Sequence, residues 1–182
     1  MAKLASPREI LDFWFSPRIS ANWYSKSPKV DQEVRDRFEY TYKEAASEKL
    51  EHWLREAKSA VALILVLDQF PRHIYRNGPG SYVADPLAQR YAERAVDAGL
   101  DLDLAPLEKR FLYMPYVHAE NRYKLAQAIE LFSQPGMESN LIHVQAHADV
   151  INRFGRYPHR NAQIGRKSTP EETEFLKYHA GW

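Results

Sequence analysis

Apolar residues recur along much of this chain with helical spacing, and strict alternation of apolar and polar residues, which would indicate strands, is absent. Val30, Val34, Phe38 and Tyr42 follow one another at intervals of four, which places them on one face of a helix. Residues 59–70 are apolar all round, so we expect this segment to lie at the centre of the fold. The pattern favours helices over strands throughout.

Helix starts are marked by a Ser, Thr or Asp followed by proline. The Ser, Thr or Asp side chain can accept hydrogen bonds from the free N–H groups of the first turn. Proline suits the next position because the N–H that it lacks would have no partner there. Ser6 with Glu9, and Thr169 with Glu172, also match the capping box. Gly99 suits the position just after a helix, because glycine adopts positive φ without strain. The four starts are Ser6-Pro7, Ser27-Pro28, Asp85-Pro86 and Thr169-Pro170.

Further helices are expected over about 105–113, 119–133 and 138–154. Together these segments predict an all-α fold, an antiparallel array of seven or eight helices. Pieces of about 30–40 residues, each a helix pair, suit an irregular array like tetratricopeptide repeats, without an exact sequence period. The chain has 182 residues and no visible linker, so 1–182 is predicted to be a single helical domain.

Charge and composition limit the partners of the protein. Lys and Arg total 25 and Asp and Glu total 24, a balance that argues against nucleic-acid and membrane-surface binding. The absence of cysteine excludes disulfides and thiolate metal sites. The longest apolar run, 60–67, is far shorter than the ~20 residues that span a bilayer, and the N-terminus lacks the features of a secretion signal. We therefore expect a soluble, cytoplasmic protein.

The stretch "LDQFPRHIYR", 67–76, places a carboxylate at the end of the apolar segment. Pro71 is expected to end this helix, and Asp68 would then lie near a helix C-terminus, where burial and the helix dipole both disfavour its charge. Asp68 therefore needs a cationic partner, either Arg72 or an arginine from 153–166. The pair is either a structural ion pair, which we favour, or a site carboxylate that orients an arginine or a ligand.

Histidines supply the candidates for proton transfer and for metal binding. In "YMPYVHAEN", 113–121, Pro115 is expected to break one helix and His118 to lie just before the next, with Glu120 close by. This pair suits acid–base chemistry, although a capping role is favoured because no nucleophile motif accompanies it. His143 and His147 share a helix face at i, i+4 but lack a third ligand, so we expect neither a metal nor another cofactor.

The stretch "RFGRYPHRNAQIGR", 153–166, holds four arginines and no acid. Arginine forks bind carboxylates and phosphates, which predicts an anion site, but they also pair with buried acids and helix ends. We expect at least one of Arg153, Arg156 and Arg160 to face a cleft shared with His118 or His159. The candidate ligand-binding residues are Asp68, Arg72, His147, Arg153, Arg156, Arg160 and Asn161, and the candidate acid–base residues are His118, Glu120 and His159.

Several long strings together resemble the bacterial domain-of-unknown-function family 924. They are "ILDFWF" (10–15), "ALILVLDQFPRHIYR" (62–76), "DPLAQRYA" (85–92), "RFLYMPYVHAEN" (110–121) and "RFGRYPHRNAQIGRKSTPEETEFL" (153–176). The resemblance runs from about residue 7 to residue 178 and implies an all-helical fold akin to tetratricopeptide repeats, with no established activity. His73 stands where the family usually has Asn, and "HAEN" where it has "HSED". Ala119 and Asn121 therefore lack the hydroxyl and carboxylate that a Ser–His–acid site would use.

Two functions remain open from the sequence. The first is a helical-repeat-like binding protein whose Arg- and His-lined cleft takes an anionic small molecule or a peptide carboxylate. The second is a hydrolase or transferase in which His118 or His159 is the acid–base group and arginines hold an anionic substrate. The absence of a recognised nucleophile, metal motif or phosphate loop favours binding. The sequence indicates no particular oligomeric state.

Overall fold

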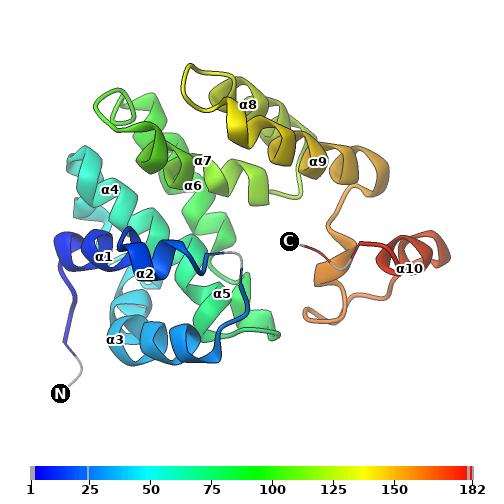
Figure 1. Cartoon of the computed structure of the whole chain (residues 1–182), viewed down its shortest axis with the longest axis horizontal. Helices are drawn as coiled ribbons and strands as arrows, with labels where there is room; N and C mark the ends of the chain where they lie inside the picture. The colour runs from blue at the N-terminus through cyan, green and yellow to red at the C-terminus, as the bar shows by residue number, and fades with distance from the viewer. Residues whose placement is uncertain (1–2, 24, 180, 182) are drawn as a thin grey trace.

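The computed structural model describes residues 3–23, 25–179 and 181, and the regular structure of these residues is helical throughout (Figure 1). The predicted all-α array is confirmed. Each of the eight expected segments holds a helix, and the four-residue α2 and the five-residue α5 are additional. The α-helices are α1 (Pro7–Trp14), α2 (Pro17–Ser20), α3 (Pro28–Ala46), α4 (Ala57–Ile64), α5 (Phe70–Ile74), α6 (Asp85–Asp97), α7 (Pro106–His118), α8 (Arg122–Phe132), α9 (Glu138–Phe154) and α10 (Pro170–Leu176). Short 3-10 helices are η1 (Glu51–Arg55), η3 (Pro79–Ser81) and η4 (Pro158–Arg160), and η2 (Leu65–Gln69) is a π-helix.

The predicted caps define the ends of several helices. The side chain of Ser6 accepts a hydrogen bond from the backbone of Glu9, whose carboxylate accepts one from the backbone of Ser6. Thr169 and Glu172 form the same reciprocal pair at α10. Gly99 follows α6 with φ of 70°. These local signals are confirmed because each depends only on residues within one turn of the chain.

Two prolines that we expected to end helices lie inside helical segments. Pro71 lies in the first turn of α5, directly after η2, where its missing N–H leaves no gap in the bonding. The wider π-turn lets the chain pass from α4 into α5 without a break. Pro115 lies within α7, which runs on to His118 because the following Tyr116 and Val117 are buried in the core and offset the lost backbone bond.

The segment predicted to be central is the centre of the core. All side chains from 60 to 67 are fully buried, and α4 packs against α1, α6 and α7. Consecutive helices α6 to α9 also pack in pairs, and Figure 1 shows α8 beside α9. The three-residue connection between α7 and α8 makes these two helices antiparallel neighbours. No helix of the described residues is long and apolar enough to cross a membrane.

The C-terminal segment turns away from α9 and returns towards the rest of the chain (Figure 1). Gly155 ends α9 with φ of 71°, the left-handed conformation in which a Cβ would be strained. Beyond it, the ring of Tyr157 is fully buried with Leu125 and Ile151 in a second, smaller apolar cluster. This cluster fixes η4 beside α8 and α9, and so places the residues after Gly155 opposite the end of α7.

Candidate functional site

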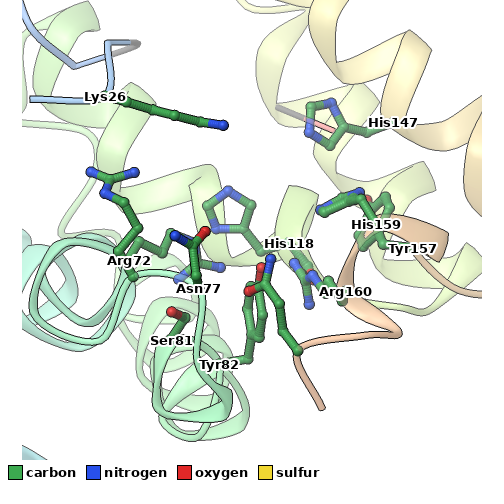
Figure 2. Close-up of a pocket in the computed structure, with 12 residues that line it drawn as sticks. Lys26, Arg72, Asn77, Ser81, Tyr82, His118, His147, Tyr157, His159 and Arg160 are labelled. Carbon is green, nitrogen blue, oxygen red and sulfur yellow. The ribbon is translucent and has the colours of Figure 1, made fainter. Parts of the chain in front are cut away.

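A pocket of about 170 Å³ lies among the end of α5, the turn around η3, the end of α7, α9 and η4 (Figure 2). Twelve of the described side chains line it; seven are basic or histidine, and none is acidic. The basic residues are Lys26, Arg72, Arg76 and Arg160, and the histidines are His118, His147 and His159. An acid-free wall with this many donors differs from the balanced charge of the whole chain.

A buried carboxylate holds the histidine in the middle of the pocket. Asp68 is fully buried, and its Oδ1 lies 2.6 Å from Nδ1 of His118. Burial alone would raise the pKa of Asp68, but its interactions with the His118 imidazole and with the charge of Arg72 overcome it and hold the pKa at about 2. The ionised carboxylate can only accept, so Nδ1 of His118 donates the proton and Nε2 carries the lone pair. The prediction that Asp68 is buried and contacts an arginine is confirmed, with Arg72 Nη1 at 3.5 Å from Oδ1.

One carboxylate of α6 joins two arginines from distant parts of the chain. Arg72 binds Asp85 with both ends of its fork, at 3.0 Å from Nη1 to Oδ1 and 3.0 Å from Nη2 to Oδ2. Arg160 reaches the same carboxylate, with Nη1 3.3 Å from Oδ2, and donates from Nη2 to the carbonyl of His118 at 3.0 Å. Asp85 thus brings two like charges together beside the imidazole of His118, as Figure 2 shows for the arginines on either side of it.

Arg160 is held by aromatic rings as well as by charge. Its guanidinium carbon lies 4.6 Å from the ring centre of Tyr82 and 4.7 Å from that of Tyr157. The side chain is buried, and its Nε has no hydrogen-bond partner among the described residues. Burial lowers the pKa of Arg160, but arginine remains a cation at any physiological pH. A fixed cation with incomplete pairing favours an added anion over an added cation at the pocket.

The three pocket histidines are held in their neutral form. Burial and the nearby charge of Arg72 lower the pKa of His118, although Asp68 acts in the opposite direction. Burial lowers the pKa of His147 to about 3, and burial with the charge of Arg160 lowers that of His159 to about 4. Nδ1 of His147 donates to the carbonyl of His143 over 2.7 Å. At neutral pH the permanent charges of the pocket therefore come from lysine and arginine alone.

The remaining cations lie towards one side of the pocket. Arg76 is bound to Asp31 through Nε at 2.5 Å and Nη2 at 2.6 Å, and His73 shares that carboxylate at 2.8 Å. Lys26 is exposed and forms no ion pair within the described part of the chain. Figure 2 shows its side chain extending over the pocket. Four cations against the carboxylates of Asp31, Asp68 and Asp85 leave one positive charge in excess.

Three candidates from the 153–166 stretch do not line the pocket. Arg156 grips the carboxylate of Glu172 through Nε at 2.6 Å and Nη2 at 2.8 Å. Asn161 donates to that same carboxylate at 3.3 Å. Arg153 pairs at the surface with Glu171 at 2.9 Å. The acids that pair with these residues lie ten to twenty positions further along the chain, in α10. The three residues therefore attach α10 to the end of α9 and do not face the pocket.

Glu120 also lies outside the pocket, contrary to its expected pairing with His118. Its carboxylate accepts both ends of the Arg166 fork, at 2.5 and 2.8 Å, and the backbone N–H of Tyr157 at 2.7 Å. Burial raises the pKa of Glu120, but Arg166 and the Tyr157 N–H outweigh it, so the carboxyl group stays ionised. We expected His118 to lie just before the next helix; it is the last residue of α7, separated from α8 by three residues, and its acid partner is Asp68.

Five of the ten candidates therefore line one pocket: they are Arg72, His118, His147, His159 and Arg160. The structure adds residues that the sequence did not single out: Lys26, Arg76, Asn77, Ser81, Tyr82, Tyr157 and Gln163 in the wall, and Asp85 behind it. Of these residues, only Asp85 stood out in the sequence, as an acid before a proline. We interpreted it as the start of a helix, so it was not considered for the pocket. The others come from loops whose packing depends on the folded chain.

The pocket lacks the ligands of a metal site. No group of three or more His, Asp or Glu side chains that could hold a metal occurs among the described residues. His147 is buried whereas His143 is exposed, so the i, i+4 pair points to two different environments. The chemistry available to this pocket is that of fixed positive charge, hydrogen-bond donors and one carboxylate-bound imidazole.

Comparisons with known proteins identify relatives without an assigned activity. A family described as bacterial protein of unknown function, DUF924, matches residues 10–180. The structure of ATU0120, a protein of unknown function from Agrobacterium tumefaciens, is similar with a TM-score of 0.88 and 37% sequence identity, over 95% of this chain and 97% of that one. No curated protein matches the chain. The chain therefore belongs to the DUF924 family of bacterial proteins.

Proposed function

We propose that this protein binds a small molecule through a phosphate or carboxylate group, held in the pocket between Arg72 and Arg160. The observation that carries the proposal is the acid-free wall, in which Arg160 shares the carboxylate of Asp85 with Arg72 and leaves its Nε without a hydrogen-bond partner among the described residues. Guanidinium groups form directional, charge-assisted hydrogen bonds with planar or tetrahedral oxyanions. An anion at this point would add hydrogen bonds to guanidinium groups that share Asp85, and would balance the one positive charge that the pocket has in excess.

The size of the pocket favours a small ligand over a peptide. Its volume of about 170 Å³ is below the roughly 300–1,000 Å³ of sites that enclose drug-sized molecules. The wall has several hydrogen-bond donors but only two aromatic rings, and both rings are in contact with Arg160. A charged head group therefore fits inside, while the rest of a larger ligand would have to extend past Lys26.

Calorimetric titration with phosphate, citrate and a short acidic peptide tests this function. We expect saturable binding of phosphate or citrate, and weaker binding of the peptide. Arg160→Lys should weaken that binding at least about tenfold, because one lost charge-assisted hydrogen bond costs roughly 1.5–3 kcal/mol. Arg153→Lys is the control: it makes the same charge-conserving substitution outside the pocket and should leave binding intact. Failure of every anion to bind the wild type would refute the proposal.

Lys26 allows a second comparison that does not disturb the fold. Lys26→Gln removes an exposed charge without an ion partner in the described residues, so stability should be unchanged. Binding should fall roughly two- to fivefold, as expected for an exposed charge pair of up to about 1 kcal/mol. Lys29→Gln makes the same change three residues away, outside the pocket. Equal effects of the two variants would mean that only the overall charge matters.

The alternative function, a hydrolase or transferase, now depends on one histidine. His118 has a fully buried carboxylate on Nδ1, the arrangement that holds an imidazole ready to accept a proton. For His159, burial together with the nearby charge of Arg160 lowers the pKa to about 4. This observation favours His118 as the acid–base group of any reaction in the pocket.

A further inference from the structure

We propose that the pocket hydrolyses a phosphate monoester, with His118 as the group that takes a proton from the attacking water. Asp68 acts through His118, as a positioning residue. This inference rests on the anion site proposed above, and it adds the chemical class of the bound group and a reaction.

The positions of the arginines select a phosphoryl group. Arg72 and Arg160 flank His118, and Arg160 donates directly to the His118 carbonyl. An anion held by both arginines in a pocket of about 170 Å³ therefore lies against the imidazole. A carboxylate is anionic but resists attack, and a carboxylic ester is open to attack but carries no charge. A phosphate monoester carries its anionic oxygens on the electrophilic phosphorus itself, and arginines that bind these oxygens offset the charge that repels a nucleophile, so this ligand uses both parts of the pocket.

The hydrogen bonds of His118 leave one nitrogen for chemistry. Nδ1 donates to Asp68 at 2.6 Å, and no described residue pairs with Nε2. The buried carboxylate fixes the ring and its tautomer, and stabilises the imidazolium that forms when Nε2 accepts a proton. The lowered pKa of His118 keeps Nε2 unprotonated at neutral pH, which is the form that a proton acceptor requires.

Water is the nucleophile in this proposal. The chain has no cysteine, and Ser81, which lines the wall, donates its hydroxyl to the carbonyl of Tyr75 at 2.8 Å. The phenol of Tyr157 likewise donates to the carbonyl of Val117. Neither hydroxyl is paired with His118 in the structure, so neither is activated by it.

The reaction then balances with water as the only co-substrate. A water oxygen forms a bond to phosphorus while one of its protons moves to Nε2 of His118. The ester P–O bond breaks, its electron pair leaves with the alcohol oxygen, and that oxygen takes a proton from solvent at the open side of the pocket. His118 then returns its proton to solvent. Arg72 and Arg160 stabilise the charge on the non-bridging oxygens throughout.

Phosphate release from p-nitrophenyl phosphate and from glycerol phosphate tests the proposal, measured with the full chain. We expect turnover by the wild type, with a rate that rises from acid to neutral pH as His118 loses its proton. His118→Gln should lower the rate by at least about 100-fold, the smaller end of general-base contributions. His143→Gln is the matched control, because it changes an exposed histidine outside the pocket.

Asp68→Asn tests whether Asp68 serves the reaction or is only part of a structural ion pair. Its amide can donate to Nδ1, which moves the ring proton to Nε2 and removes the base. We expect this variant to bind inorganic phosphate at least as tightly as the wild type, to lose turnover about 100-fold or more, and to lose the rise in rate between acid and neutral pH. If Asp68→Asn fails to fold, His118→Gln carries the same comparison of binding with turnover.

The outcomes distinguish this inference from the function on which it rests. Phosphate binding without hydrolysis of either ester overturns the reaction and leaves the anion site standing. Loss of phosphate binding in the wild type overturns both. Turnover that survives His118→Gln, or a phosphorylated form of the protein trapped during turnover, contradicts attack by a water that His118 activates.

Discussion

Asp68 carries a charge inside the buried π-helix η2, and its surroundings determine the cost of that charge. The flanking residues 60–67 are fully buried and apolar, so the carboxylate depends on His118, on Arg72 and on the Gln69 amide at 2.5 Å. An ionised group in such a place is stable only when it is paired and hydrogen-bonded. The side chain therefore contributes to the stability of the fold and to the orientation of the pocket.

Asp68→Ala should lower the free energy of unfolding by about 3 kcal/mol, the lower end for breaking a buried pair. The lower end applies because Arg72 keeps its two bonds to Asp85, so the groups that lose a partner are the His118 Nδ1–H and the Gln69 amide. Urea denaturation measures the change. Asp12→Ala, which removes an exposed carboxylate 3.5 Å from Arg8, is the control and should cost less than about 1 kcal/mol. An equal cost for both would contradict the role of Asp68.

Charge balance at the residue scale was only partly predictable from sequence. The need of Asp68 for a cation followed from its apolar neighbours, and that cation is Arg72. The main partner, His118, lies 50 positions away, and no local pattern connects the two. The same limit applies to the arginines: Arg153 and Arg156 pair with acids of the next helix, whereas Arg160 pairs with Asp85, 75 positions earlier.

At the scale of elements, helix starts were predictable and helix interruptions were not. A cap depends on three or four consecutive residues, so Ser6 and Thr169 could be identified directly. Whether proline ends a helix depends on tertiary packing. Pro71 is accommodated by the π-turn before it, and Pro115 by the burial of the turn after it. The π-turn itself contains Asp68, and such turns are frequent at functional sites.

The cap of α10 provides a test at this scale. Thr169→Ala removes the side-chain oxygen that accepts from the Glu172 N–H at 3.2 Å, and should cost about 1 kcal/mol, within the usual range of roughly 0.5–2. Thr173→Ala, in the same helix, removes a hydroxyl that is not part of the cap and should cost less. Thermal unfolding of both variants measures the difference. Equal stability of the two would show that the cap adds nothing.

The stability of the whole molecule depends on pH, because buried histidines must stay neutral in the folded chain. Burial lowers the pKa of His147 from its usual 6.5 to about 3 and, with Arg160, that of His159 to about 4. The folded chain therefore binds fewer protons than the unfolded chain below pH 6.5. The stabilisation from these two groups is complete above pH 6.5 and is lost progressively as the pH falls towards 4 and then 3, by up to about 1.4 kcal/mol per group and pH unit.

We expect urea denaturation to show a clear loss of stability between pH 7 and pH 5, before carboxylates begin to titrate. His147→Gln cannot take up this proton and should make the dependence shallower, while His143→Gln, which changes an exposed side chain, should not. A stability that is constant over this range would contradict the burial of these histidines.

The arrangement of helices across the whole chain explains why the pocket has its charge. Arg72 follows the central segment, His118 ends α7, and Arg160 arrives on the returning C-terminal segment (Figure 1). Each of these positions is fixed by a different part of the core, so the positive charges cannot move apart to relieve their repulsion. The anion that we propose for the pocket would relieve it.

A crystal structure determined with tungstate, a heavy oxyanion that resembles phosphate, tests this claim most directly. We predict strong anomalous density in the pocket, within hydrogen-bond distance of the guanidinium groups of Arg72 and Arg160 and close to His118. Tungstate found only at exposed pairs such as Arg153 and Glu171, with water alone in the pocket, would contradict the account.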